Sequence, residues 1–349
     1  MKCARAMAGV ALLVAMTAAA AEAQEATSVP GVAGEFRGMS ARGDVVWASG
    51  RAGTYARSTD GGVTWEAGVI PGAETLFLVD VEALDARAAC VLATSFDAGV
   101  GRIYRTPDGG ATWSVAYEFA HPEVFFDGLA FWDADRGVAF SDPVDGAFLV
   151  VRTTNGCGSW TEVPRKHLPT PLEGEAGFAA SGTAIAVAGT RHAWIGTGGG
   201  AVARVLLTTD SGATWTARAT PMAAGPATGI FGIAFRDTLH GVAVGGNYQR
   251  PGSAAPNVLR TGDGGRTWAF VGTTAPPGVR YGAVYVPGSG TVVAGGPTGF
   301  GLSDDDGATW TAVDSAFTYG LTATGAAGWV AGPGGRIVRL GPDVLRKAR

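Results

Sequence analysis

Apolar and β-branched residues in this chain come in short runs separated by glycine, aspartate and proline. The first series of such runs covers residues 36–41, 45–49, 54–58 and 64–67. Runs of this length, bounded by turn residues, are typical of β-strands, and segments with a sustained helical period are rare in the chain. The pattern predicts an all-β fold built from many short antiparallel strands.

One eight-residue phrase recurs six times and divides the chain into repeats. We call it the octapeptide motif; its consensus is S/T-x-D-x-G-x-T-W, and its copies end at Trp65, Trp113, Trp160, Trp215, Trp268 and Trp310. Successive tryptophans lie 48, 47, 55, 53 and 42 residues apart. Repeats with this period are single supersecondary units that bury their apolar faces by stacking on their neighbours.

The motif has the chemistry of a hairpin tip. Its aspartate can accept hydrogen bonds from backbone N–H groups of the turn, its glycine supplies positive φ, and we expect its Thr-Trp pair to start the return strand. The third copy carries Asn155, Cys157 and Ser159 in place of Asp, Gly and Thr, and asparagine can still make the turn bonds. Identical turns spaced around a ring cannot converge on one ligand, so we interpret the aspartates as structural.

The octapeptide motif resembles the Asp-box, or BNR repeat, of β-propeller proteins such as sialidases, some endoglucanases and the photosystem II assembly/stability factor family. The resemblance implies that the motif is a structural turn between the third and fourth strands of a blade. The resemblance covers nearly the whole chain after the N-terminus. As a whole, the chain most resembles the photosystem II assembly/stability factor-like propellers. Because the motif occurs in enzymes and in non-enzymes, the fold is better defined than the function.

We predict a seven-bladed β-propeller of four-stranded antiparallel blades, forming one domain over residues 24–340, with a tail at 341–349. Six blades contain an octapeptide hairpin, and segments 319–324, 328–332 and 336–340 supply three strands of the seventh. Its fourth strand is expected from residues 27–30, so that the two chain ends close the ring and leave no open edge. Six blades with an unclosed remnant are the alternative.

Residues 1–23 have the features of a secretory signal peptide. Lys2 and Arg5 precede an apolar run at 8–21, and Ala21-Glu22-Ala23 is a small-x-small cleavage site. We therefore expect export to a periplasm or the exterior. Cys90 and Cys157 sit in non-equivalent parts of neighbouring repeats, so we expect them not to pair, although export would permit a disulfide.

The net charge and the motifs of the chain limit the classes of ligand and reaction to expect. With 26 basic and 30 acidic residues the net charge is −4, and without a basic stripe nucleic acid is not expected as a partner. The four histidines fall in different repeats without metal-ligand spacing, and neither a P-loop lysine nor a G-x-S-x-G elbow is present. We expect no metal, no cofactor, no catalytic residues and a monomer.

The longer connections between strands indicate which face of the ring binds. Turns between the first and second strands are short, whereas the connections at 141–146, 164–177, 196–201 and 245–257 are long and chemically mixed; such loops commonly carry ligand-binding groups. Inner strands aligned on an early glycine place further polar side chains at the same mouth. The candidate binding residues are Arg37, Asp127, Asp142, Asp145, Glu175, Tyr248, Arg250, Tyr281 and Tyr319.

Two classes of function remain open. The first is an exported, non-enzymatic propeller that binds a protein or peptide, as an assembly platform for a membrane or envelope complex. The alternative is a glycoside hydrolase: Arg37 and Tyr281 would serve sialidase-like chemistry, and Asp127 and Asp142 an endoglucanase-like pair of acids. A carbohydrate-binding propeller would stack sugars on Tyr248, Tyr281 and Tyr319.

Overall fold

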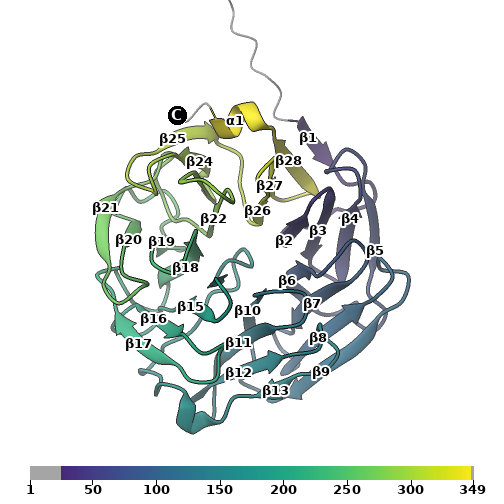
Figure 1. The fold of residues 1–349 in the computed structure, drawn as a ribbon, viewed down its shortest axis with the longest axis horizontal. Coiled ribbons are helices and arrows are strands. Elements are labelled where there is room, and N and C mark those ends of the chain that lie inside the picture. Colours follow the sequence, from purple (N-terminus) through teal and green to yellow (C-terminus); the bar gives the residue numbers. More distant parts are fainter. Residues whose placement is uncertain (1–24, 347–349) are drawn as a thin grey trace, which may run out of the picture.

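The computed structural model describes residues 25–346 and contains seven four-stranded antiparallel sheets arranged in a ring (Figure 1). The predicted all-β, seven-bladed propeller is confirmed. The described helices are one short 3₁₀ turn, η1 (Arg165–His167), and one short helix, α1 (Pro342–Arg346). Within residues 25–346, no helix has the length and apolar character needed to cross a bilayer.

Each blade runs from an inner strand at the centre to an outer strand at the rim. The strands of blades one to three, inner to outer, are β2 (Phe36–Arg42), β3 (Val45–Gly50), β4 (Thr54–Ser58) and β5 (Glu66–Val69); β6 (Phe77–Ala83), β7 (Ala89–Thr94), β8 (Val100–Thr106) and β9 (Ser114–Ala120); and β10 (Phe126–Phe131), β11 (Gly137–Val144), β12 (Ala147–Thr153) and β13 (Thr161–Glu162).

The remaining blades repeat this order. Their strands are β14 (Ile185–Ala188), β15 (His192–Gly196), β16 (Arg204–Thr208) and β17 (Thr216–Ala219); β18 (Thr228–Phe235), β19 (Gly241–Asn247), β20 (Val258–Thr261) and β21 (Ala269–Gly272); β22 (Gly282–Tyr285), β23 (Val292–Gly296), β24 (Gly299–Ser303) and β25 (Thr311–Asp314); and β26 (Leu321–Ala323), β27 (Gly328–Ala331) and β28 (Arg336–Leu340), with β1 (Glu25–Ser28) outermost.

The two ends of the chain meet in blade seven. Strand β1 pairs antiparallel with β28, so that Ser28 lies opposite Arg336 (Figure 1). The strand lies two residues earlier than the expected range of 27–30, because Pro30 has no N–H to donate and begins a turn. The signal-peptide residues 1–23 lie outside the described residues.

The octapeptide turn of blade four shows how the motif works. The Asp210 carboxylate accepts hydrogen bonds from the Thr208 hydroxyl at 2.7 Å, the Thr214 backbone N–H at 2.9 Å and the Thr214 hydroxyl at 2.7 Å. The Trp215 indole N–H donates to the Gly212 carbonyl at 3.0 Å. The threonine and tryptophan therefore belong to the turn, and the return strand β17 begins only at Thr216, two residues after the expected start at Thr214.

Neighbouring blades are joined where the second strand of one blade meets the octapeptide turn of the next. The Trp194 indole on β15 donates to the Gly264 carbonyl at 2.8 Å, and a Cβ on Gly265 would lie 2.9 Å from that indole nitrogen. Trp329 on β27 makes the same contact with the Gly61 carbonyl at 3.0 Å. At these two joints the fifth motif position is glycine because it lies close to an indole, at a positive φ.

Cys90 and Cys157 form a disulfide with Cα atoms 6.0 Å apart, so the expectation that they remain unpaired was wrong. Cys90 on β7 and Trp194 on β15 occupy equivalent positions, because each pairs with the residue just before its own blade's motif. Cys157 replaces the fifth-position glycine of the third motif. Between blades two and three, a disulfide therefore takes the place of the indole–glycine contact.

Replacing Asp210 with alanine removes the acceptor of three turn hydrogen bonds, so we expect a loss of about 1–3 kcal/mol in the free energy of unfolding. Asp210→Asn is the matched control, because Asn155 accepts from the Ser159 N–H at 3.0 Å in the third motif and should cost little. Urea unfolding of both variants measures the difference. Equal losses in the two variants would show that the carboxyl position does not stabilise the turn.

Reducing the Cys90–Cys157 bond should lower the free energy of unfolding by about 2–4 kcal/mol, because the bond spans 67 residues of chain. Urea titrations with and without a reductant measure this loss. The double variant Cys90→Ala, Cys157→Gly should unfold at the same urea concentration in both titrations. A wild-type midpoint that ignores the reductant would contradict a stabilising role.

Candidate binding site at the channel mouth

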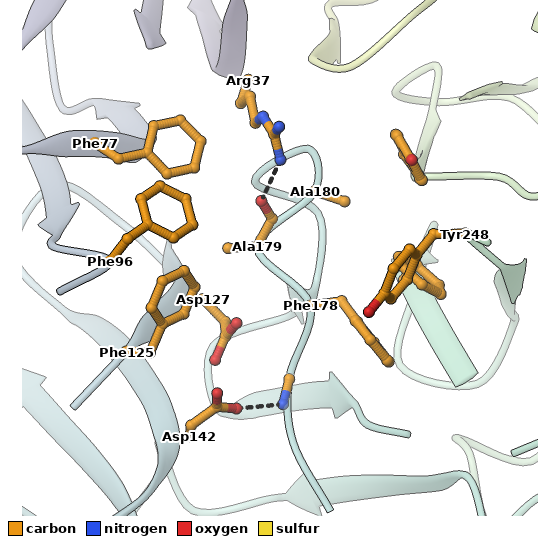
Figure 2. A pocket seen from close by; sticks show the side chains of 13 residues that line it. Arg37, Phe77, Phe96, Phe125, Asp127, Asp142, Phe178, Ala179, Ala180 and Tyr248 are labelled. Carbon is orange, nitrogen blue, oxygen red and sulfur yellow. Dashed lines mark hydrogen bonds between the residues drawn. The ribbon is translucent and has the colours of Figure 1, made fainter. Parts of the chain in front are cut away.

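An irregular segment, residues 177–184, crosses the centre of the ring before β14 begins (Figure 2). We call it the channel segment. Its backbone accepts from the Arg37 guanidinium at Ala179 (3.3 Å) and from the Ile233 N–H at Thr183 (2.8 Å). The Ser181 hydroxyl donates to the Tyr281 carbonyl at 2.7 Å. Blades one, five and six thus hold the segment in place.

A cavity of about 430 Å³ lies beside the channel segment, and we call it the mouth pocket. It opens on the face of the propeller that carries the long connections between strands, which we call the long-loop face. Aromatic side chains make up most of its wall, and three charged residues complete it. The lining residues are Arg37, Phe77, Phe96, Phe125, Asp127, Asp142, Gly177, Phe178, Ala179, Ala180, Phe231, Tyr248 and Tyr281. Figure 2 shows the Phe77, Phe96 and Phe125 rings on one side of the channel segment and Tyr248 on the other.

β-Bulges on the inner strands direct three of these side chains. The pairing of β2, β10 and β18 with their neighbours shifts at Arg37, Asp127 and Phe231, each of which is followed by glycine. A bulged residue leaves the ladder and its side chain is re-aimed, here toward the mouth. The glycine is required by space: a Cβ on Gly38 would lie 2.5 Å from the Asp80 Cα atom. This explains why aligning the inner strands on glycine finds mouth residues.

The aromatic wall is layered and partly exposed. Phe96 stacks on Phe77 with centroids 5.5 Å apart and contacts Phe125 at 5.4 Å, while 62% of its own surface stays exposed. On the other side Phe178 stacks on Phe231 at 4.0 Å, and Tyr248 at the rim is 43% exposed. Large exposed rings fixed by buried neighbours are typical anchor points for a binding partner.

Arg37 forms the basic end of the pocket. Its guanidinium lies 4.4 Å from the Tyr319 centroid and 4.9 Å from that of Phe77, and it pairs with Glu35 at 3.5 Å. Burial lowers the pKa of Arg37 from its ordinary value. The Arg37 Nε atom is buried and has no hydrogen-bond partner, so a bound acceptor would satisfy it.

Asp127 and Asp142 form the acidic end as a directly interacting carboxyl pair. Burial, followed by the Asp142 charge, raises the pKa of Asp127 well above its usual range. Burial also raises the pKa of Asp142 to about 6, while the Gly177 N–H donates to its carboxylate at 2.7 Å. Asp127 is 1% exposed, and its Oδ2 atom has no hydrogen-bond partner.

The structure brings five of the nine predicted residues into the mouth pocket: Arg37, Asp127, Asp142, Tyr248 and Tyr281. Tyr319 lies behind this wall, stacked on Tyr281 with centroids 5.8 Å apart. Asp145 is exposed and pairs with His121 at 3.4 Å and Arg165 at 3.5 Å. Arg250 is exposed in the loop after β19 and does not line the pocket.

Glu175 is placed differently from its expected position at the start of the inner strand of blade four. That strand, β14, begins only at Ile185, because the channel segment intervenes. Glu175 is buried at 3% exposure, where it accepts from Arg204 Nε at 2.9 Å and from the Thr197 hydroxyl at 2.6 Å. It holds a loop together outside the mouth pocket.

Sequence reasoning missed the phenylalanines that build the pocket: Phe77, Phe96, Phe125, Phe178 and Phe231. Phe96, Phe125 and Phe178 lie in connections between strands, where an aromatic residue breaks the run of small and polar residues. The signal that could have found them is an aromatic residue in a connection on the long-loop face.

No protein-family model and no curated protein sequence matches the chain. Solved structures do resemble it. YCF48 bound to D1 peptide has 15% identity and a TM-score of 0.63, covering 91% of this chain and 95% of that one. YCF48 from Cyanidioschyzon merolae has 17% identity and a TM-score of 0.61, with 91% and 99% covered. The Pan2 WD40 domain of Neurospora crassa has 12% identity, a TM-score of 0.60, and 88% and 89% covered. These similarities show the propeller fold.

The raised pKa values predict that stability falls as pH rises. The pKa of Asp142, ordinarily 3.8, reaches about 6 in the fold, and the pKa of the half-buried Glu82 reaches about 7. The fold therefore favours both protonated forms, and their contribution is full at low pH and lost as pH rises through about 6 and 7. Asp142→Asn should remove about 1–2 kcal/mol of the decline between pH 4 and pH 7.

Chemical unfolding at several pH values measures this profile. Asp142 interacts with Asp127 and forms no ion pair with a described basic residue, so its replacement by asparagine leaves no unpaired cation. Glu82→Gln is a control in the channel, where Glu82 accepts from the Ser40 hydroxyl at 2.8 Å, and should remove only the upper part of the decline. An Asp142→Asn profile that superimposes on wild type would overturn the assignment.

Proposed function

We propose that this protein is an exported, non-enzymatic β-propeller that binds a segment of a protein or peptide in the mouth pocket. In this role it would serve as an assembly platform for a membrane or envelope complex. The observation that carries the proposal is the combination of exposed aromatic anchors with two buried, unpartnered polar atoms, Arg37 Nε and Asp127 Oδ2. A peptide offers apolar side chains for the anchors, and its backbone offers both donors and acceptors.

The pocket is pre-formed, which favours binding without a large ordering cost. Its rings pack on one another, and the channel segment that forms its floor is bonded to several blades. A rigid concave site with aromatic walls and few polar groups matches the general character of ligand sites. Phe96 and Tyr248 at the rim extend the apolar surface beyond the cavity. A bound peptide of several residues needs such an extended surface.

Two further observations support the location and the partner class. The signal-like residues 1–23 and the Cys90–Cys157 disulfide agree with an exported protein in an oxidising compartment, periplasmic or secreted. A protein of the same fold, YCF48, has been solved bound to D1 peptide, and the octapeptide motif resembles that of the photosystem II assembly/stability factor family. Both favour a peptide over a sugar as the ligand of this chain.

The carboxyl geometry argues against glycoside hydrolysis. Asp127 and Asp142 interact directly, whereas glycosidases hold their two carboxyls about 5–9.5 Å apart so that the scissile bond or a water fits between them. The pKa of Tyr281 is raised, by burial first and then by Tyr319, which is opposite to activation as a nucleophile. Tyr281 and Tyr319 also stack on each other, so each covers a face of the other that a sugar would need.

The proposal is tested with a displayed library of random dodecapeptides selected on the mature protein. Selected peptides should bind wild type and lose about tenfold or more in affinity for Phe96→Ala, Tyr248→Ala, because truncating an aromatic anchor costs about 1–3 kcal/mol. Phe270→Ala is the matched control, since Phe270 is 40% exposed on the outer strand β21. Failure to select any peptide, or equal affinity for all three proteins, would refute the proposed function.

A further inference from the structure

A second cavity, of about 560 Å³, adjoins the mouth pocket and is acidic. Its lining includes Glu123, Asp142, Glu173 and Glu175, and none of the described residues that line it is basic. We call it the acidic cavity. Asp142 lines both cavities, so the Asp127–Asp142 pair belongs to the wall between them.

Several basic groups around the two cavities are already paired with other carboxylates. Arg204 pairs with Glu175, and Arg37 at the far end of the mouth pocket pairs with Glu35 at 3.5 Å. Arg165 and His121 face Asp145 at the outer edge. Among the described residues, no lysine, arginine or histidine forms an ion pair with Asp127, Asp142 or Glu173. Carboxyl groups therefore outnumber basic groups in the lining of the two cavities.

The unpartnered oxygen of Asp127 points to a donor on the ligand. Asp127 is 1% exposed and its Oδ2 accepts no hydrogen bond, although the side chain lines the mouth pocket (Figure 2). Leaving a buried acceptor unsatisfied costs free energy that a bound donor recovers. A cationic donor recovers the most, because it also neutralises the neighbouring Asp142.

The aromatic wall suits the rest of such a ligand. Cations bind favourably over the faces of aromatic rings, and the pocket already holds one in this way: Arg37 lies over Phe77 and Tyr319. Lysine and arginine have long apolar stems that pack against rings while the charged head reaches a polar partner. A basic side chain thus matches both halves of the mouth pocket.

We propose that the mouth pocket selects peptides in which a lysine or arginine is flanked by apolar residues, and that Asp127 and Asp142 bind its cationic head. The inference rests on the proposed function and names the chemistry of its ligand. The acidic cavity, with Glu173 at its lip, attracts the same basic side chain by charge complementarity.

The test compares three blocked peptides, Ac-Ala-Phe-Lys-Phe-Ala-NH₂, its arginine analogue and its norleucine analogue, by calorimetric titration of the mature protein. The lysine and arginine peptides should bind about tenfold or more tightly than the norleucine peptide. In Asp127→Asn, Asp142→Asn the preference should disappear. Glu66→Gln, on the outer strand β5 of blade one, is the control that changes one charge elsewhere and should keep it.

A melting curve shows whether the double variant is folded. If it is not, Glu173→Gln at the exposed lip of the acidic cavity replaces it and should reduce the preference about twofold to threefold. Equal binding of the norleucine peptide, or a preference that survives in the variants, would overturn this inference and leave peptide binding intact. No binding of any of the three would also overturn it, and the peptide library then decides the proposed function separately.

Discussion

The contact between the second strand of one blade and the octapeptide turn of the next joins blades four and five, blades seven and one and, as a disulfide, blades two and three. Trp194 and Trp329 each place an indole N–H on a turn carbonyl of the following blade. The Cys90–Cys157 bond occupies the same position between blades two and three. Each contact needs a turn of fixed shape. The internal hydrogen bonds of the octapeptide motif therefore also determine how neighbouring blades pack. The Asp carboxylates serve this packing, which leaves the opposite face free to bind.

A ring fixed in this way positions its inner strands, and the inner strands position the site. The bulges in β2, β10 and β18 direct Arg37, Asp127 and Phe231 toward the mouth. The channel segment then spans the space between the inner strands and provides the floor of the mouth pocket. The same segment also forms part of a separate cavity on the motif side, where Gly182 and Thr183 lie near Asp80 and Glu82. The proposed peptide binding on one face therefore does not require an open channel.

The fold could be predicted from the sequence because its signals are local and repeated. Six copies of one turn at a regular period define the blades, and the x-Gly pairs on inner strands place Arg37, Asp127 and Tyr281 at one mouth. The channel segment could not be predicted, since residues 177–184 carry no strand pattern and their partners are backbone groups of distant blades. Glu175 was misplaced for this reason. The disulfide was missed because its two cysteines occupy different positions in adjacent repeats. Comparing equivalent positions of the repeats does not show that these two positions are in contact.

Site-specific photo-crosslinking tests the central claim, that the mouth of the ring binds peptide. A benzoyl-phenylalanine replaces Phe96 at the rim of the mouth pocket or, as the control, Val63 in the first octapeptide turn, where the side chain is 63% exposed. Each protein is irradiated with a tryptic digest of envelope proteins, and the adducts are identified by mass spectrometry. The account predicts peptide adducts at position 96 and few at position 63. Adducts of equal yield at both positions, or adducts confined to position 63, would contradict it.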